Sequence, residues 1–341
     1  MIRTAGYDIG GAHLKVALIE GGRPVNVHQI PCALWRGVDQ LAAAFAEARR
    51  VTGIAERHAV TMTGELADVF PDRFTGVARI VELATAALGP DARFWMGRRG
   101  FGDAAEAAAR WEDVASANFL ASATLAAARW GEGLLIDMGS TTTDIVPFKA
   151  GVDAAHGLTD GDRLRSGELV YTGLTRTPVM AVVTRERFQG AWQTLARDPF
   201  ATMADVRRVL GELPDGVDQH ATADGRGTSV AESRARLARC FGRDVQEGDA
   251  ADWAVSAGLI AEEQLASILE GCRQVLGAAA LAPNAPVIAA GIGTEVAGEI
   301  ARRLARTAQS FGTLTGAQPQ VAVWATRCAP AVAVGMLLGD K

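Results

Sequence analysis

The chain has 341 residues, of which 49% are hydrophobic and 21% are charged, a composition that disfavours a disordered chain. At roughly 150 residues per domain, this length predicts two domains. The 34 basic and 39 acidic residues leave a net charge of -5, which argues against a nucleic-acid partner because such binding needs a surplus of positive charge.

The N-terminal part of the sequence predicts alternating strands and helices. Glycine pairs at Gly10 and Gly11 and at Gly21 and Gly22 separate three short apolar runs. We expect strands at residues 4–9, 14–20, 24–30, 58–62 and 93–96. We expect helices at residues 38–51, 73–88, 103–110 and 114–129.

At Gly131 the pattern restarts, with a strand, an aspartate, a glycine turn and a second strand, about 130 positions after the same order at Asp8. This spacing fits two related domains rather than a solenoid. Strands are expected at 134–137, 143–148, 286–290 and 321–324, and helices at 250–281, 295–308 and 329–338. Residues 178–245 read as a polar, loop-rich region with helical pieces. The alternation predicts an α/β fold.

No leader-like segment or long uncharged apolar stretch is apparent, so we expect a cytoplasmic protein with no membrane partner. The four cysteines, Cys32, Cys240, Cys272 and Cys328, form no C-x-x-C pair. We expect buried, unreactive thiols rather than a metal site or a disulfide scaffold.

The first glycine turn follows Asp8 and contains Gly10, Gly11, His13 and Lys15. Glycines let backbone N–H groups approach a phosphate, Asp8 suits a Mg²⁺ ion held through water, and Lys15 suits a phosphate oxygen. Only three lysines occur, at 15, 149 and 341, in a chain that otherwise uses arginine. A plain β-hairpin explains this segment about equally well.

The second turn places Gly139 and the hydroxyl residues Ser140, Thr141 and Thr142 between two aspartates, Asp137 and Asp144. Hydroxyls and N–H groups suit phosphate, and the carboxylates suit a metal. A solvated polar loop is the alternative, but the repetition after a second buried strand favours a ligand site.

A third glycine turn, with Gly291 and Gly293, follows the strand at 286–290. Such a turn suits close contact with a phosphate or a flat ligand. It does not match the dinucleotide fingerprint, because residue 296 is valine.

These three turns, in this order, resemble the phosphate and adenosine motifs of the actin, sugar-kinase and Hsp70 superfamily. Within it, the chain resembles the hydantoinase A/oxoprolinase family in three blocks, at residues 61–68 (TMTGELAD), 166–173 (SGELVYTG) and 176–179 (RTPV). The resemblance implies an actin-like (ribonuclease H-like) duplicated ATPase fold with a central cleft. The domains would be 1–131 and 132–341, with an insertion around 178–248 and the C-terminal helix at about 329–338 packed back onto the first domain.

The chain's length and these blocks further resemble a small branch of the family that is linked to tetrahydromethanopterin-dependent one-carbon transfer and methanofuran biosynthesis. That branch implies transfer of an (aminomethyl)furanylmethyl group from its diphosphate to the phenol oxygen of a γ-glutamyl-tyramine or tyrosine acceptor, with release of diphosphate. The partners would be these two small molecules, Mg²⁺ would be the cofactor, and ATP would not be required.

Under this hypothesis, the glycines and hydroxyls of the first two turns bind the diphosphate, and Gly291 and Gly293 remain nucleotide-site candidates. Asp8, Asp137 and Asp144 would position Mg²⁺, and Lys15 would neutralise a phosphate oxygen. His13 or Glu65 would take the phenol proton, since an unperturbed phenol has a pKa of about 10.

Several further residues are candidates for the acceptor or the diphosphate: Arg163, Arg165, Glu168, Tyr171, Arg176 and Asn118. The arginines suit bidentate contact with a carboxylate or phosphate, although a solvated cluster is equally consistent with them. Tyr171 is expected to stack on a substrate ring or to lie in the core, and Asn118 to pack a helix. The other histidines share no ligand spacing. Residues 215–227 predict a mobile loop that would serve as a lid.

Two other functions fit the same motifs. One is an ATP-dependent kinase or a hydantoinase-like hydrolase, and the other is a non-catalytic nucleotide-binding assembly subunit. The two turn aspartates favour an enzyme, and a homodimer is expected because homodimers are common.

Overall fold

The computed structural model describes residues 2–339. Its first large sheet is built around β1 (Arg3–Ile9), which pairs with β2 (His13–Glu20) as an antiparallel hairpin and with β4 (Arg57–Met62) in parallel. The outer strands are β3 (Arg23–Pro31) beside β2, and β5 (Arg93–Trp95) and β6 (Phe101–Gly102) beyond β4. All the N-terminal strands expected from the sequence are therefore confirmed.

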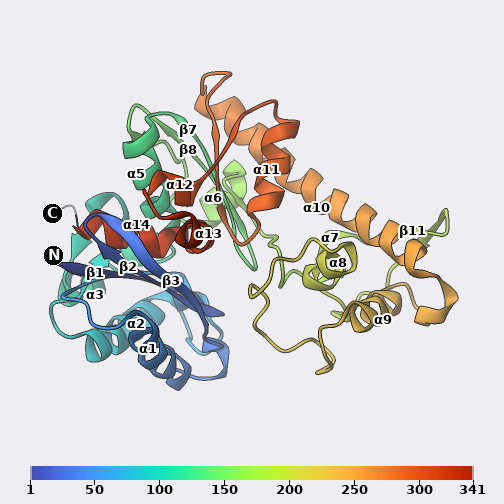
Figure 1. Ribbon diagram of the computed structural model, residues 1–341, viewed down its shortest axis with the longest axis horizontal. Coiled ribbons are helices and arrows are strands. Elements are labelled where there is room, and N and C mark those ends of the chain that lie inside the picture. The colour runs from blue at the N-terminus through green and yellow to red at the C-terminus, as the bar shows by residue number, and fades with distance from the viewer. Residues whose placement is uncertain (1, 340–341) are drawn as a thin grey trace.

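The second large sheet repeats this order (Figure 1). Its central strand, β7 (Gly133–Met138), forms a hairpin with β8 (Thr143–Lys149) and pairs in parallel with β13 (Val287–Gly291). The strands that complete it are β9 (Val152–Asp153) and β10 (Leu169–Val170) beside β8, and β14 (Ala308–Ser310) beside β13. The predicted duplication is thus present at the level of sheet topology.

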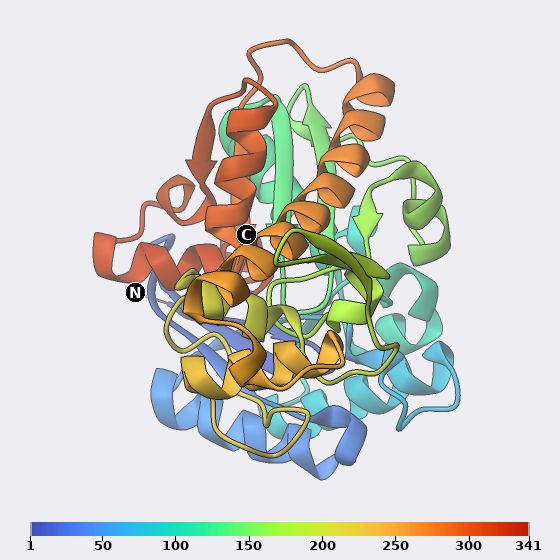
Figure 2. The same cartoon turned by 90° about the vertical axis from the view of Figure 1, so that its right-hand side faces the viewer.

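Helices cover both sheets because alternate residues of each strand face opposite sides. Two helices pack on the outer face of the first sheet, α1 (Asp39–Thr52) and α2 (Arg73–Leu88). Two more pack on the outer face of the second, α10 (Ala250–Ala279) and α11 (Thr294–Arg303), as Figure 2 shows. Between the sheets lie α5 (Asn118–Trp130) and α14 (Ala329–Gly339).

The two inner helices are rich in small residues, which lets backbones approach closely. α14 is buried on every side except near its end and packs on β1, β2 and β4. A Cβ added at Gly6 would overlap the carbonyl oxygen of Ala331, so glycine is required where β1 and α14 cross. The C-terminal helix therefore contacts the first sheet.

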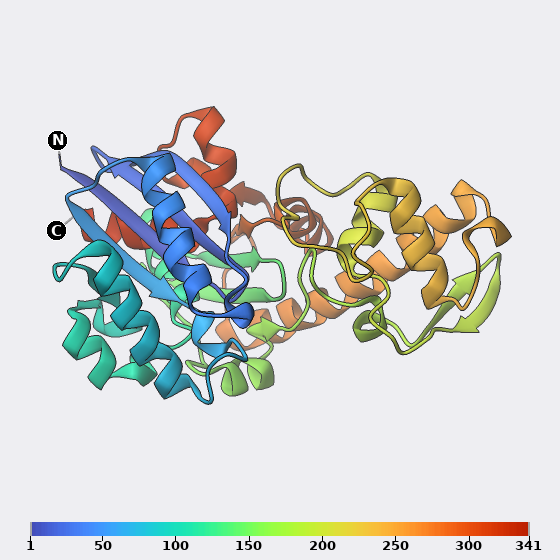
Figure 3. The same ribbon diagram turned by 90° about the horizontal axis from the view of Figure 1, so that it is seen from below.

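Residues 178–248 form a side lobe at the far end of α10, with a hydrophobic core of their own (Figure 3). The lobe contains α7 (Val179–Val182), the hairpin of β11 (Arg185–Phe188) and β12 (Ala191–Thr194), α8 (Met203–Leu210), α9 (Val230–Cys240) and η4 (Val245–Glu247). Trp253 of α10 completes its core. The remaining short elements are η1 (Leu34–Arg36), η2 (Gly64–Leu66), η3 (Gly97–Arg99), α3 (Ala104–Ala109), α4 (Trp111–Val114), α6 (Asp160–Ser166), α12 (Phe311–Leu314) and α13 (Pro319–Arg327).

Three expected elements are corrected. The strand predicted at 321–324 is helical, because Pro319 begins α13 and Val321 and Trp324, three residues apart, face the same core. The helix predicted at 295–308 ends at Arg303, and β14 follows it. The helix predicted at 114–129 begins only at Asn118, after a break at Ser116.

Within residues 2–339, no single helix has the length and apolar character needed to cross a membrane. Only α13 and α14 taken together meet these criteria, and they are bent by 106° at their junction.

Candidate active site

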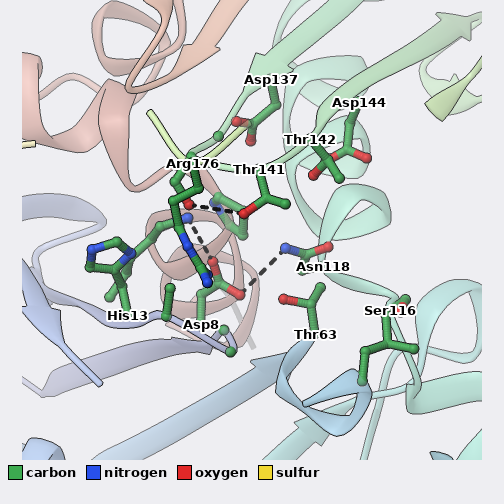
Figure 4. Close-up of a pocket in the computed structure, with 18 of the residues that line it drawn as sticks. Asp8, His13, Thr63, Ser116, Asn118, Asp137, Thr141, Thr142, Asp144 and Arg176 are labelled. Carbon is green, nitrogen blue, oxygen red and sulfur yellow. Dashed lines mark hydrogen bonds and ion pairs between the residues drawn. The ribbon is translucent and has the colours of Figure 1, made fainter. Parts of the chain in front are cut away.

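A cavity of about 380 Å³ lies where the β1–β2 turn faces the β7–β8 turn, with α5 behind them (Figure 4). The structure brings most of the predicted site residues into its wall. They are Asp8, Gly10, Gly11, His13, Lys15, Asn118, Asp137, Gly139, Ser140, Thr141, Thr142, Asp144, Arg163, Tyr171 and Arg176. Two halves of the chain that are distant in sequence therefore form one polar site.

Each turn is shaped by its own backbone hydrogen bonds. In the first, the N–H of Gly10 donates to the carbonyl of His13 at 2.9 Å, and in the second, the N–H of Gly139 donates to that of Thr142 at 2.9 Å. The carbonyl of Ser140 accepts from the N–H of Arg176 at 2.8 Å. A Cβ added at Gly173 would overlap the backbone of Ser140. The 173–176 segment thus lies against the second turn and brings Arg176 to the cavity.

Asp8 is buried and held from two sides. Its Oδ2 lies 3.2 Å from the Nζ of Lys15, the residue opposite it across the β1–β2 hairpin, and its Oδ1 accepts from the Nδ2 of Asn118 at 3.4 Å. Burial alone would lower the pKa of Lys15, but the carboxylates of Asp8 and Asp137 outweigh it and raise this pKa above its ordinary value. Lys15 is therefore a permanent positive charge in the cavity wall.

Asp137 occupies the place in the second hairpin that Asp8 occupies in the first, but the residue opposite it is Asp144. Like charges directly opposite each other repel. Burial, with added repulsion from Asp144 and Asp8 and partial relief from Lys15, raises the pKa of Asp137 to about 7. Asp144 is itself neutralised by Arg163, with Oδ1 and Nη2 2.6 Å apart. Within residues 2–339, the Asp137 carboxylate has no hydrogen-bonding partner.

These pairings bear on the expected Mg²⁺. Over the part of the chain that is described, no three His, Cys, Asp or Glu side chains lie close enough together to hold a metal ion. Asp8 and Asp144 already have cationic partners, so a site made of protein ligands alone does not fit. Asp137 fits a Mg²⁺ ion whose other ligands are substrate oxygens and water.

Arg176 is the cavity cation without an acidic partner in the described residues. The guanidinium lies 4.5 Å from the ring centroid of Trp35 and makes no side-chain hydrogen bond or ion pair. Figure 4 shows it between Asp8 and Thr141, pointing into the cavity. Arg176 is an exposed residue of the cavity wall, so its unpaired guanidinium is available to an anionic ligand.

A strap, residues 211–229, connects the side lobe to the first sheet. Gln219 Nε2 donates to the carbonyl of Gln29 at 3.3 Å, and His220 Nε2 donates to that of Ala12 at 2.9 Å. The His220 ring lies 4.6 Å from that of His13 and 5.3 Å from that of Trp35. The strap contains the predicted lid segment, and it packs His220 directly behind the cavity wall.

Five predicted residues do not line the cavity. Arg165 is exposed on α6. Glu168 accepts hydrogen bonds from the backbone N–H groups of His156 and Gly157 and holds a loop. A Cβ at Gly291 or Gly293 would overlap Met138, so both glycines serve close packing of β13 and α11 on β7. Glu65 is buried behind the wall.

Sequence reasoning missed several wall or near-wall residues: Trp35, Gln29, Ser116 and His220. No local pattern distinguishes them, because four separate segments bring them together: β3 carries Gln29, η1 carries Trp35, the break before α5 carries Ser116 and the strap carries His220. Tyr171 does not lie in the core, since it is 63% exposed and lines the cavity.

His13 should make stability depend on pH. Burial, aided by the charges of His220, Lys15 and Arg176, lowers the pKa of His13 from 6.5 to about 2. The unfolded chain binds a proton at His13 below pH 6.5 and the folded chain does not, so this contribution is full above pH 6.5 and falls by about 2 kcal/mol by pH 5. Urea unfolding at pH 7.5 and pH 5 should show a smaller pH-dependent loss for His13→Gln than for the wild type. Equal losses in the two proteins would contradict the assignment.

Comparison with solved structures places the fold. An acetone carboxylase in its nucleotide-free form matches with a TM-score of 0.55 and 10% identity, over 88% of this chain and 67% of that one. A ROK family glucokinase from Streptomyces griseus, solved with glucose and AMPPNP, matches with a TM-score of 0.50 and 14% identity, over 99% and 100%. The chain thus has the duplicated actin-like fold of ATPases and sugar kinases.

Sequence comparison gives nearer relatives. A synthase from Methanocaldococcus jannaschii, (4-{4-[2-(gamma-L-glutamylamino)ethyl]phenoxymethyl}furan-2-yl)methanamine synthase, is 32% identical over 251 residues, 73% of this chain and 74% of that protein. The protein of the same name from Methanococcus vannielii is 32% identical over 114 residues, 33% of this chain and 51% of that protein. The family model for hydantoinase/oxoprolinase matches residues 56–312. The chain belongs to the hydantoinase/oxoprolinase family.

Proposed function

We propose that this chain is a diphosphate-releasing transferase of methanofuran biosynthesis. It would move an (aminomethyl)furanylmethyl group from its diphosphate to the phenol oxygen of a γ-glutamyl-tyramine or γ-glutamyl-tyrosine acceptor. The name of the relatives describes a product in which a phenol oxygen is joined to a furanylmethyl carbon. The observation that carries the proposal is the unpaired Arg176 beside the second glycine turn, because a diphosphate supplies the anion that it lacks.

In this reaction the bond from the furanylmethyl carbon to the diphosphate oxygen breaks, and the phenol oxygen bonds to that carbon. The diphosphate leaves with the electron pair, so negative charge develops on it in the transition state. Arg176, Lys15 and the hydroxyls of the second turn would stabilise that charge. Mg²⁺, when bound, would neutralise diphosphate oxygens near Asp137.

The cavity suits a small diphosphate better than a nucleotide. The third glycine turn contributes only Ile292 to the wall, because Gly291 and Gly293 are occupied by packing against Met138. An ATP-dependent kinase remains the second candidate, because the structural relatives include a glucokinase solved with AMPPNP.

Calorimetry with inorganic diphosphate and with a non-hydrolysable ATP analogue, each with Mg²⁺, separates the two candidates. We expect saturable binding of diphosphate and none of the ATP analogue at the same concentration. Incubation with the furanylmethyl diphosphate and each phenol acceptor should then yield the ether, detected by mass spectrometry. Tight binding of the analogue, with no ether formed from either acceptor, would contradict the transferase.

A further inference from the structure

Glu65 is a buried carboxyl group with only half of its hydrogen-bonding capacity used. It lies in η2, directly after β4, and only 1% of its surface is exposed. Its Oε1 accepts the hydroxyl of Ser116 at 2.7 Å, whereas its Oε2 has no partner among residues 2–339. A Cβ at Gly76 of α2 would overlap the Glu65 backbone, so this segment packs closely on α2. A buried oxygen without a hydrogen bond costs folding free energy, so its presence needs an explanation such as a catalytic function.

Ser116 connects this carboxyl group to the cavity. It stands in the break between α4 and α5 with a φ of 52°, a left-handed conformation that is rare for serine. It lines the cavity, two residues before Asn118, whose side chain contacts Asp8 (Figure 4). The strained backbone therefore places a hydroxyl between the buried Glu65 and the space where the substrates would bind.

We propose that Ser116 and Glu65 form a proton relay that takes the acceptor's phenol proton. This inference rests on the proposed function. As the phenol oxygen bonds to the furanylmethyl carbon and diphosphate departs, the phenol proton passes to Ser116 Oγ and the serine proton passes to Glu65 Oε1. Glu65 ends protonated, Ser116 is regenerated, and the charges balance.

The surroundings of Glu65 suit a proton acceptor. Burial raises its pKa above the ordinary range, and the hydrogen bond from Ser116 opposes this in part. The charged groups that face it are Arg73 of α2 and Asp160 of α6, which pair with each other at 2.7 Å. His13, the other predicted base, is a poor acceptor, because its pKa of about 2 means that it binds a proton only weakly.

Acceptors with ring fluorines test the relay, because a phenol that is already ionised at the assay pH has no proton to give. With the natural acceptor, Glu65→Gln and Ser116→Ala should each lower kcat by about 100-fold. With the ionised fluorinated acceptor, both variants should come within about tenfold of the wild type. A purely structural role predicts the same loss with both acceptors.

Matched controls are Ser122→Ala, which removes a buried hydroxyl of α5 that has no partner among the described residues, and Glu186→Gln, which changes a buried carboxyl group in the side lobe. Both should retain wild-type kcat. Full activity of Ser116→Ala, or losses that do not depend on the acceptor, would overturn the relay. If Glu65→Gln does not fold, Ser116→Ala alone decides. Failure of the wild type to form ether with any acceptor would instead refute the proposed function.

Discussion

Replacing Arg176 with alanine is expected to lower kcat/KM for the furanylmethyl diphosphate by about 100- to 1000-fold, the cost of removing one preorganised donor from a developing anion. Arg176 has no acidic partner in residues 2–339 that its loss would leave unpaired, so the folded state should be little affected. Arg176→Lys should recover only part of the loss, because lysine has neither the planar fork nor the stacking on Trp35.

Initial rates and calorimetry with inorganic diphosphate measure this effect. Arg185→Ala is the matched control, since Arg185 also stacks on a tryptophan, Trp192, at 4.9 Å, but in the side lobe. It should leave kcat/KM and diphosphate binding unchanged. Unaltered diphosphate affinity in Arg176→Ala would show that the anion binds elsewhere in the cavity.

The parts of the site that the sequence predicted are those set by local chain geometry. A buried strand that ends in aspartate, followed by glycines and a second strand, forms a hairpin whose turn is exposed at the sheet edge. The positions of Asp8, Lys15, Asp137 and Asp144 follow from that pattern, and the superfamily resemblance implied a central cleft between the two domains.

The other features of the site depend on contacts between residues far apart in the chain, and a local stretch of sequence does not reveal such contacts. Gly291 and Gly293 look like ligand-binding glycines, but the space above them is filled by Met138 from another strand. Ser116 sits in an alanine-rich run that reads as one helix, and the break at this residue places it at the cavity. The His220 contact depends on a strap that crosses from the side lobe.

The two duplicated hairpins differ in how their aspartates are neutralised. The first hairpin pairs Asp8 with Lys15 on its own strands, whereas the second pairs two carboxylates, Asp137 and Asp144, and Asp144 takes its cation, Arg163, from α6. Lys15 acts on both, because it contacts Asp8 and also lowers the pKa of Asp137. Removing Lys15 should therefore change the electrostatics of both turns of the site.

Lys15→Met is expected to abolish measurable turnover and to destabilise the fold by about 3–5 kcal/mol, the range for removing one partner of a buried ion pair. Urea unfolding and ether formation measure the two effects. Lys149→Met is the matched control: the Lys149 side chain is half-exposed and its Nζ lies 3.9 Å from Glu132, so the change should cost at most about 1 kcal/mol and leave activity intact.

The double variant Lys15→Met/Asp8→Asn separates folding from chemistry. If the destabilisation arises because Asp8 is left charged and unpaired, Asp8→Asn should restore most of the lost stability, since the buried unpaired charge is then gone. Activity should not return, because the cation needed by the departing diphosphate is still missing. A double variant that regained turnover would show that Lys15 serves only to pair with Asp8. A double variant that stayed as unstable as Lys15→Met would show that the main stabilising partner of Lys15 is Asp137.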